Sequence, residues 1–237
     1  MTQTARPLPP ARARDTREVP AYPVAEAARY LRLPAATLRA WVNGTAASAQ
    51  GAATATARVI HPAGRDPLML SFWNLVEAHV LRALRTEHGV SLPAVRKALR
   101  YAEKELGISR LLLSPELKTD AGRLFLDRYG ALTELTASGQ LAMRRLLESH
   151  LRRVEWDRWQ FPVRLFPFVA DEVIEASPTI AIDASIAFGR PIIRRRGIST
   201  SVIADRIDAG ESVADVAADY EITELEVSAA VLIERAA

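Results

Sequence analysis

One stretch, Tyr22 to Gly44 (YPVAEAARYLRLPAATLRAWVNG), constrains the fold more than any other because it has the pattern of a helix-turn-helix. Apolar residues recur at helical spacing on both sides of the break at Leu33-Pro34, namely Ala25, Ala28, Leu31, Leu38 and Trp41. The outer face of the second helix then carries Thr37, Arg39 and Asn43, whose polar groups could reach base edges and phosphates in a major groove. We therefore predict a DNA-binding face there, although the pattern also fits a helical hairpin inside an ordinary core.

The distribution of charge favours the DNA-binding interpretation. Residues 1–170 hold 25 Lys and Arg against 15 Asp and Glu, whereas residues 171–237 hold 6 against 13. Arginine supplies 28 of the 31 cations, and its guanidinium suits bidentate contacts to guanine or phosphate, although genome base composition also raises arginine content. The asymmetry predicts a polyanion partner for the first part of the chain and a different partner for the second.

Composition sets the remaining bounds. With 237 residues, 49% of them hydrophobic, the chain is long enough for two domains or for one domain with an appendage. No apolar run approaches the roughly 18 residues that span a bilayer, and no hydrophobic segment follows the basic N-terminus, so we expect a cytoplasmic protein without membrane contact. The absence of cysteine and the scatter of the four histidines argue against a metal centre or other cofactor. We expect His79 to be a core histidine rather than a ligand.

The segments around the helix-turn-helix have weaker patterns. Residues 1–20 contain arginines among prolines without periodicity, which predicts a disordered basic arm that is either a plain tail or a DNA-touching one. Residues 45–56 are small and polar, as in a flexible loop. Two short extended runs, 58–61 and 66–70, flank Pro62-Ala63-Gly64-Arg65, where a winged helix would have its β-hairpin. That wing would bring Arg58 and Arg65 to the DNA backbone.

Two amphipathic helices follow. Ser71 is predicted to cap the first, whose apolar stripe runs up to Gly89 and comprises Phe72, Leu75, Val76, His79, Val80 and Ala83. Ser91 opens the second, with Val95, Leu99, Ala102 and Leu106 facing inward. Arg96, Lys97 and Arg100 are expected to face outward, as a solvated surface or as a contact to DNA phosphate.

This order of parts resembles the MerR-like winged helix-turn-helix family. The resemblance rests on AEAARYLRLPAATLRAW, the loop after it, LSFWNLVEAHVLRALR and VSLPAVRKALRYA. Leu38-Arg39-Ala40-Trp41 stands where MerR regulators commonly have Arg-Tyr-Tyr-Glu, and the wing lacks their usual Gly-Tyr-Arg pattern. Residues 21–107 are accordingly predicted to be a MerR-like DNA-binding domain.

Residues 108–170 are expected to be a small α+β segment in place of the long dimerisation helix of MerR activators. Turn signals at 120–122 and 128–130 divide 111–135 into short runs typical of a three-stranded meander. Ser138 then caps a predicted helix with one apolar face comprising Met143, Leu146, Leu147, His150, Leu151 and Val154. The alternation of Phe161, Val163 and Leu165 predicts a final strand.

The last segment, 171–237, resembles a module classed as a domain of unknown function and found in VapB-type antitoxins. The resemblance rests on PTIAID at 178–183, FGRPIIR at 188–194, Ile203, GESV at 210–213 and ADY at 218–220. Gly189 and Pro191 predict a turn around which two strands pair. Three helices are expected after it, at 200–209, at 212–219 with Ser212 as cap, and at 223–235 with a capping box made by Thr223 and Glu226.

The last two helices could form a second helix-turn-helix, but charge argues against DNA binding there. The second of them, TELEVSAAVLIER, presents Glu224, Glu226 and Glu234, and carboxylates repel phosphates. Its apolar stripe, Val227, Ala230, Val231 and Ile233, suits a dimer seam or docking surface better. Arg190, Arg194, Arg195 and Arg196 form a basic patch that could bind nucleic acid or, as we prefer, a protein partner.

No catalytic motif is evident. Asp205 with Asp208, and Asp215 with Asp219, are spaced to share a helix face and could bind Mg²⁺, but solvated helix faces explain them better. Gly-rich phosphate loops, nucleophile elbows and His-Glu metal motifs are missing from the sequence. We predict a mainly α, α+β protein that is not an enzyme.

Both resemblances together imply a function. They imply the antitoxin of a type II toxin–antitoxin pair, which binds operator DNA as a homodimer, represses its operon and neutralises a PIN-like ribonuclease toxin. The alternative is a MerR-like transcription regulator that senses a small molecule through residues 107–170 and has no toxin partner. A neighbouring gene for a short PIN-like protein would favour the first, and a divergent transporter or enzyme gene the second.

Overall fold

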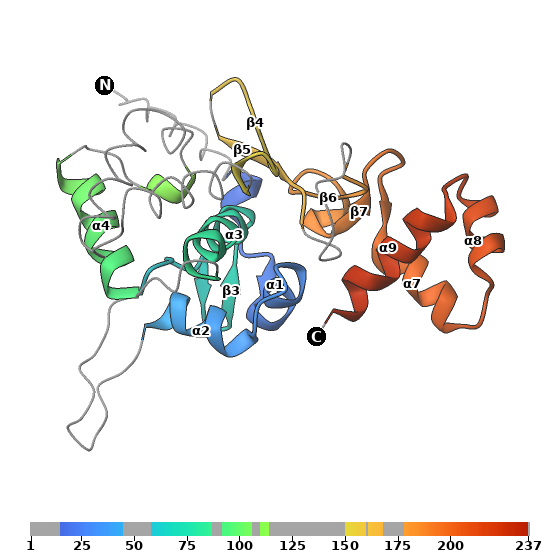
Figure 1. Ribbon diagram of the computed structural model, residues 1–237, viewed down its shortest axis with the longest axis horizontal. Coiled ribbons are helices and arrows are strands. Elements are labelled where there is room, and N and C mark those ends of the chain that lie inside the picture. Colours follow the sequence, from blue (N-terminus) through green and yellow to red (C-terminus); the bar gives the residue numbers. More distant parts are fainter. Residues whose placement is uncertain are drawn as a thin grey trace, which may run out of the picture.

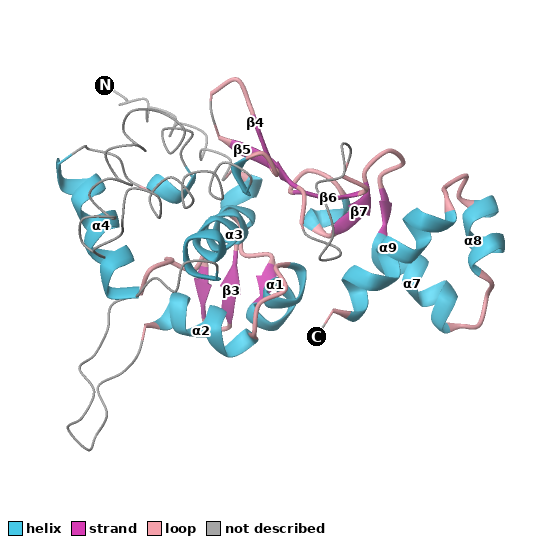
Figure 2. Ribbon diagram, viewed as in Figure 1, coloured by secondary structure: helices cyan, strands magenta, loops and turns pink. Residues whose placement is uncertain are grey.

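The structure, a computed structural model, describes residues 15–44, 58–86, 92–105, 110–113, 150–159, 161–167 and 178–236. These residues form an α+β fold with two antiparallel sheets, one of three strands and one of five (Figure 2). Figure 1 shows the helix-turn-helix and its small sheet beside a C-terminal group of helices, with the larger sheet between them. The expected loop at 45–56 lies outside the described residues.

Two short helices form the predicted helix-turn-helix. Strand β1 (Tyr22–Pro23) leads directly into α1 (Val24–Tyr30), and α2 (Ala35–Asn43) starts after Pro34. Proline favours a helix start because the backbone N–H that it lacks would have no partner within the helix at that position. Four of the five apolar side chains expected inside are buried, namely Ala28, Leu31, Leu38 and Trp41. Ala25 is exposed, so that part of the prediction was wrong, and Val24 and Ala27 are buried on α1 instead. Gly44 has a φ of 71° and ends α2.

The wing is a hairpin, but its turn differs from the predicted one. Strands β2 (Gly64–Arg65) and β3 (Leu68–Leu70) pair, with β3 in the centre of the order β1-β3-β2. The turn is therefore at residues 66–67 and not at 62–65, and residues 58–61 are not a strand. The backbone of residues 58–61 makes hydrogen bonds to α2 and not to a strand, since Val59 N and Ile60 N both donate to Trp41 O.

Helix α3 (Phe72–Thr86) is the buried centre of this half of the protein. Ser71 caps it as predicted, since Asn74 N donates to Ser71 Oγ at 3.2 Å. The predicted stripe is buried, and so are Trp73, Leu81 and Leu84 outside it. Gly89, where we expected the helix to end, lies outside the described residues.

Helix α4 (Leu92–Glu105) buries Val95 as predicted, but it also buries Arg96. The prediction that Arg96 faces outward was therefore wrong, whereas Lys97 and Arg100 are exposed. Periodicity within α4 could not show this, because Arg96 lines a pocket together with residues from other parts of the chain, including Arg110 and Leu111.

The predicted meander at 111–135 is not supported where the structure describes it. Leu111–Leu113 is a short 3-10 helix, η2, with all three leucines buried. A strand would have turned the middle side chain away from the others, whereas one helical turn buries all three. Residues 114–149, which include the rest of the meander and most of the helix predicted after Ser138, lie outside the described residues.

A five-stranded antiparallel sheet follows, with its strands in chain order. It comprises β4 (Val154–Trp156), β5 (Pro162–Leu165), β6 (Ile180–Asp183), β7 (Pro191–Ile193) and β8 (Ile198–Ser199). Val154 begins a strand and does not continue a helix, because its partner is Leu165 of the strand that sequence analysis did predict. Leu165 of β5 pairs with Ile182 of β6. The sheet therefore contains strands from both sides of residue 170, where the sequence predicted one segment to end and the next to begin.

The C-terminal helices match the prediction closely. They are α7 (Thr200–Asp208), α8 (Val213–Asp219) and α9 (Glu224–Arg235). Ser212 caps α8 by accepting from Asp215 N, and Thr223 with Glu226 forms the capping box of α9. The predicted strand pair around Gly189 is β6 with β7.

The described part of the N-terminal segment, from residue 15, packs against the rest of the protein. Asp15 caps a 3-10 helix, η1 (Thr16–Glu18), and Arg17 forms an ion pair with Asp157 at 2.8 Å. Arg17 also lies over the stacked rings of Trp73 and Phe161, 5.3 and 5.6 Å from their centroids. This arginine therefore does not belong to a disordered arm, and residues 1–14 lie outside the described residues.

One hydrophobic core joins the helix-turn-helix to the C-terminal helices, since buried residues from Tyr22 to Ile233 form a single cluster. Polar contacts cross the same junction, where Tyr22 Oη donates to Gly189 O at 2.8 Å and Arg29 pairs with Glu234 at 2.9 Å. None of the helices described here has the length and hydropathy of a transmembrane span.

Candidate nucleic-acid interface

The outer face of α2 presents the polar residues predicted to contact DNA. Arg39 and Asn43 are exposed, and Thr37 is half-buried beside them. Arg39 has no ion-pair partner among the described residues, so its guanidinium is available to an outside anion. Leu38, Trp41 and Val42 occupy the inner face. The helix is therefore amphipathic, with its polar side directed outward.

The position of α2 is fixed from three sides. Its inner face packs against α1, its Trp41 carbonyl accepts from Val59 N and Ile60 N, and the turn before it is held by Arg82, whose guanidinium donates to Leu31 O at 3.0 Å. These contacts use the buried half of the helix only. Arg39 and Asn43 remain free of them.

The two arginines assigned to the wing lie in different environments. Arg65 is on β2 of the hairpin and is exposed, as expected for a residue beside a DNA backbone. Arg58 is half-buried and precedes the hairpin, where it lines a pocket with Arg96 and Arg100. The structure therefore supports a wing position for Arg65 and not for Arg58.

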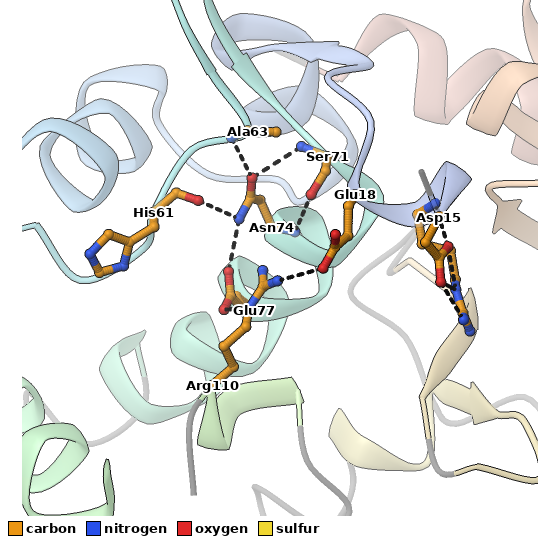
Figure 3. Close-up of polar contacts among 9 residues, drawn as sticks. Asp15, Glu18, His61, Ala63, Ser71, Asn74, Glu77 and Arg110 are labelled. Carbon is orange, nitrogen blue, oxygen red and sulfur yellow. Dashed lines mark hydrogen bonds and ion pairs between the residues drawn. The ribbon is translucent and has the colours of Figure 1, made fainter. Parts of the chain in front are cut away.

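Asn74, which the sequence analysis did not single out, holds the base of the wing (Figure 3). Its Oδ1 accepts from Ala63 N at 3.0 Å and from Ser71 N at 3.1 Å, one donor on each side of the hairpin. Its Nδ2 donates to His61 O and to Glu77 Oε2, both at 2.9 Å. The only hint in the sequence was a pair of polar residues one turn apart, Asn74 and Glu77, in a largely apolar helix.

The predicted basic patch in the C-terminal part is neutralised within the chain. Arg190 pairs with Glu26 of α1, Arg194 with Glu155 of β4, Arg195 with Glu226 and Arg196 with Glu221. The Arg195 guanidinium also lowers the pKa of Glu226 by hydrogen bonding to it. Sequence analysis missed these pairs because most partners are more than twenty residues away.

The apolar stripe of α9 faces the protein interior. Val227, Ala230 and Ile233 are buried, and Val231 is half-buried, so the stripe packs against α7, β6 and β7 of the same chain and leaves Val227 inaccessible to a partner. The opposite side of α9 exposes two leucines seven residues apart. Leu225 is 67% exposed and Leu232 is 53% exposed, so both side chains are accessible to a partner.

Three titratable residues that the sequence analysis considered as possible ligands, His79, Asp208 and Asp219, make contacts within the protein. His79 is fully buried as predicted, with Nε2 3.1 Å from His150 O, and burial lowers its pKa to about 3. Asp219 pairs with Arg206, and Asp208 with Arg235. Within the described ranges, no three His, Asp or Glu side chains are grouped as metal ligands.

Comparison with known families identifies two matching domains. A family described as "Putative DNA-binding HTH domain" matches residues 20–99, which span β1 to α4. A family described as "Protein of unknown function (DUF433)" matches residues 180–232, from β6 into α9. A helix-turn-helix DNA-binding domain is therefore present, followed by the module expected from the C-terminal resemblance.

Two relatives cover most of the chain. The protein named "Putative antitoxin VapB45" of Mycobacterium tuberculosis (strain ATCC 25618 / H37Rv) is 29% identical over 226 residues, 87% of this chain and 90% of its own length. The crystal structure of Rv2018 from Mycobacterium tuberculosis has 25% sequence identity and a TM-score of 0.65, and the match covers 90% of this chain and 98% of that one. The resemblance to a VapB-type antitoxin with a helix-turn-helix is confirmed, and the matches point to a DNA-binding regulator.

Proposed function

We propose that this chain is the antitoxin of a type II toxin–antitoxin pair, which binds its operator through α2 and neutralises a PIN-like ribonuclease toxin. The observation that carries the proposal is the similarity to a protein named as an antitoxin over 87% of the chain, together with the helix-turn-helix domain. The exposed Arg39 and Asn43 supply side chains suited to guanine, adenine and phosphate.

The arrangement of this domain supports a MerR-like winged helix-turn-helix. The order β1, α1, α2, β2, β3, α3, α4 is what such a domain requires, with the β2–β3 hairpin as its wing. One short helix contacts too few base pairs for useful specificity, so we propose a homodimer on a pseudo-palindromic operator with half-sites about one helical turn apart. Footprinting on the chain's own promoter would show two-fold symmetric protection.

DNA binding is tested by removing the exposed polar groups of α2. Arg39→Ala and Asn43→Ala are each expected to weaken operator binding by about 1–3 kcal/mol, the scale of one good base contact, without changing stability. Thr37→Ala is expected to have a smaller effect because Thr37 is half-buried. The measurement is binding to operator and scrambled DNA across a salt series.

Arg152→Ala is the matched control, since Arg152 is equally exposed but lies before β4, far along the chain from α2. It removes the same charge and is expected to leave operator affinity unchanged. Equal affinity and specificity in all of the α2 variants and the control would show that α2 does not contact the operator.

The exposed face of α9 is the surface we propose for the toxin. Leu225 and Leu232 lie on one side of α9, and the acidic balance of residues 171–237 suits the basic RNA-binding cleft expected of a ribonuclease. The arginines at 190, 194, 195 and 196 and the residues Val227 and Val231 are less suitable than we predicted from sequence, because the chain itself engages them.

Leu225→Asp with Leu232→Asp is expected to weaken capture of the protein encoded by the neighbouring gene by about 2 kcal/mol, since each change puts a charge into a desolvated apolar contact. Operator binding is expected to stay unchanged. Val19→Asp is the control, because Val19 is also an exposed aliphatic residue but follows η1. Undiminished capture by the α9 variant would place the toxin elsewhere.

A further inference from the structure

A pocket of about 180 Å³ lies within the DNA-binding half, between α3, α4, the stretch after residue 57 and the start of η2. Four arginines from three of these segments line it, Arg58, Arg96, Arg100 and Arg110. Arginines repel one another, so four around one small space need compensating negative charge. The pocket therefore concentrates positive charge within a small space.

Arg96 is the most buried of the four. It is only 7% exposed, and its Nε has no hydrogen-bond partner within the part of the chain that the structure describes. Burial, and then the charge of Arg100, lower its pKa. A buried guanidinium without a carboxylate is costly, so an anion bound at Arg96 would stabilise the folded chain.

The carboxylates of the pocket do not supply that anion. Glu77 is already bound by Arg110, whose Nε is 3.1 Å from Oε1, and by Asn74 Nδ2, 2.9 Å from Oε2 (Figure 3). Glu103 is exposed at the rim of the pocket. Against these two carboxylates stand four guanidinium groups, so the pocket keeps a positive charge.

We propose that this pocket binds a small organic anion whose carboxylate or phosphate group is held by Arg96 and Arg100. Guanidinium groups bind both kinds of oxyanion in a bidentate manner. Leu99, Leu111 and Leu112 also line the space, so an apolar part of the ligand has a surface to pack against. The volume of about 180 Å³ is smaller than the roughly 300–1,000 Å³ of pockets for drug-sized ligands, so a small anion fits best.

A DNA phosphate fits this site less well than a free anion. Arg96 is buried under neighbouring residues, whereas a phosphate within a duplex stays at the surface of the protein. The location nevertheless links the pocket to the DNA-binding helix, because the wall at Val59 is bonded to the Trp41 carbonyl near the end of α2. An anion bound to Arg96 would link α4 to the stretch that contains Val59, and so restrict the motion of the segment that is hydrogen-bonded to α2.

The test is thermal unfolding of the full chain at constant ionic strength, with chloride replaced stepwise by phosphate, glycerol 3-phosphate, acetate or succinate. The first two probe a phosphate group and the last two a carboxylate. At about a hundredfold excess over Kd, a specific anion raises Tm by roughly 5 °C. Arg96→Met is expected to lose this rise and to weaken binding, measured by calorimetry, about ten- to a hundredfold.

Lys97→Met is the matched control, since it removes one cation from the neighbouring, exposed position of α4. It is expected to respond to the anions as the unchanged chain does. Arg100→Gln, at a more exposed position of the pocket, is a second test that does not alter a buried residue. It is expected to weaken anion binding even if Arg96→Met fails to fold.

Three results would overturn the proposal. One is the absence of any rise in Tm with all four anions. A second is an equal rise in the unchanged chain, Arg100→Gln and Arg96→Met, which would indicate general screening of charge. The third is loss of operator affinity in Arg96→Met without any anion binding by the unchanged chain, which would assign the pocket to the DNA backbone.

Discussion

Asn74 uses its whole side chain for structure, because both of its polar atoms make two hydrogen bonds and the residue is fully buried. It bonds the backbone on both sides of the wing and the carboxylate of Glu77. A buried amide can make four such bonds only when donors and acceptors are placed around it on separate segments. Asn74 therefore fixes where the hairpin leaves α3.

At this scale we expect Asn74→Ala to lower the free energy of unfolding by about 2–4 kcal/mol, because it leaves Ser71 N buried without a partner and removes the side-chain partner of Ala63 N and His61 O. The measurement is urea denaturation. Asn43→Ala, on the exposed face of α2, is the control and is expected to cost less than about 0.5 kcal/mol. Similar losses in both variants would contradict the role of Asn74.

Asn74→Asp adds a test by pH. It keeps the acceptor oxygen but sets a second carboxylate against Glu77, and like charges raise the pKa of such a pair above the unfolded values of about 4. A raised folded pKa gives stability that is present at low pH and lost as pH rises. The deficit of this variant is therefore expected to be larger at pH 7 than at pH 5, and an equal deficit at both would exclude the contact with Glu77.

Among the elements, those specified by local sequence were predictable. The caps at Ser71, Ser212 and Thr223 and the break at Leu33-Pro34 each depend on residues within a few positions, and the structure has helices bounded at all of them. For the same reason the outward face of α2, with Arg39 and Asn43, could be identified from helical spacing alone.

Elements and contacts that depend on distant residues were not predictable in the same way. Val154 continued an apparent helical stripe, but pairing with Leu165 makes it a strand. Val227 and Ile233 formed a stripe on α9 that an outside partner or the chain itself could cover, and periodicity does not say which. Arg96 was assigned to solvent because the pocket that it lines is formed largely by residues far away in sequence, such as Arg58 and Glu77.

The whole molecule is held together at the junction between α1 and the C-terminal helices. Tyr22 is fully buried there, and burial raises the pKa of Tyr22, so its hydroxyl stays protonated and donates to Gly189 O. Ion pairs from Arg190 to Glu26 and from Arg29 to Glu234 surround this bond. Because the hydrophobic core also runs through the junction, a partner bound to α9 acts on an element that packs directly against the helix-turn-helix.

A double-mutant cycle at Tyr22 and Gly189 tests whether the two halves unfold as one unit. Tyr22→Phe is expected to cost about 1–2 kcal/mol, since it leaves the Gly189 carbonyl without its donor. Gly189→Ala is expected to cost about 3 kcal/mol or more, because its Cβ would lie 2.3 Å from Tyr22 Oη and its φ of +78° is strained for alanine. With the hydroxyl removed, the nearest remaining atom of residue 22 would be 3.2 Å away, so the double variant is expected to be at least about 1 kcal/mol more stable than the sum of the single costs implies.

Urea unfolding followed by circular dichroism measures all four proteins. Strict additivity, or two separate transitions in the unchanged chain, would show that the junction does not couple the DNA-binding half to the C-terminal helices.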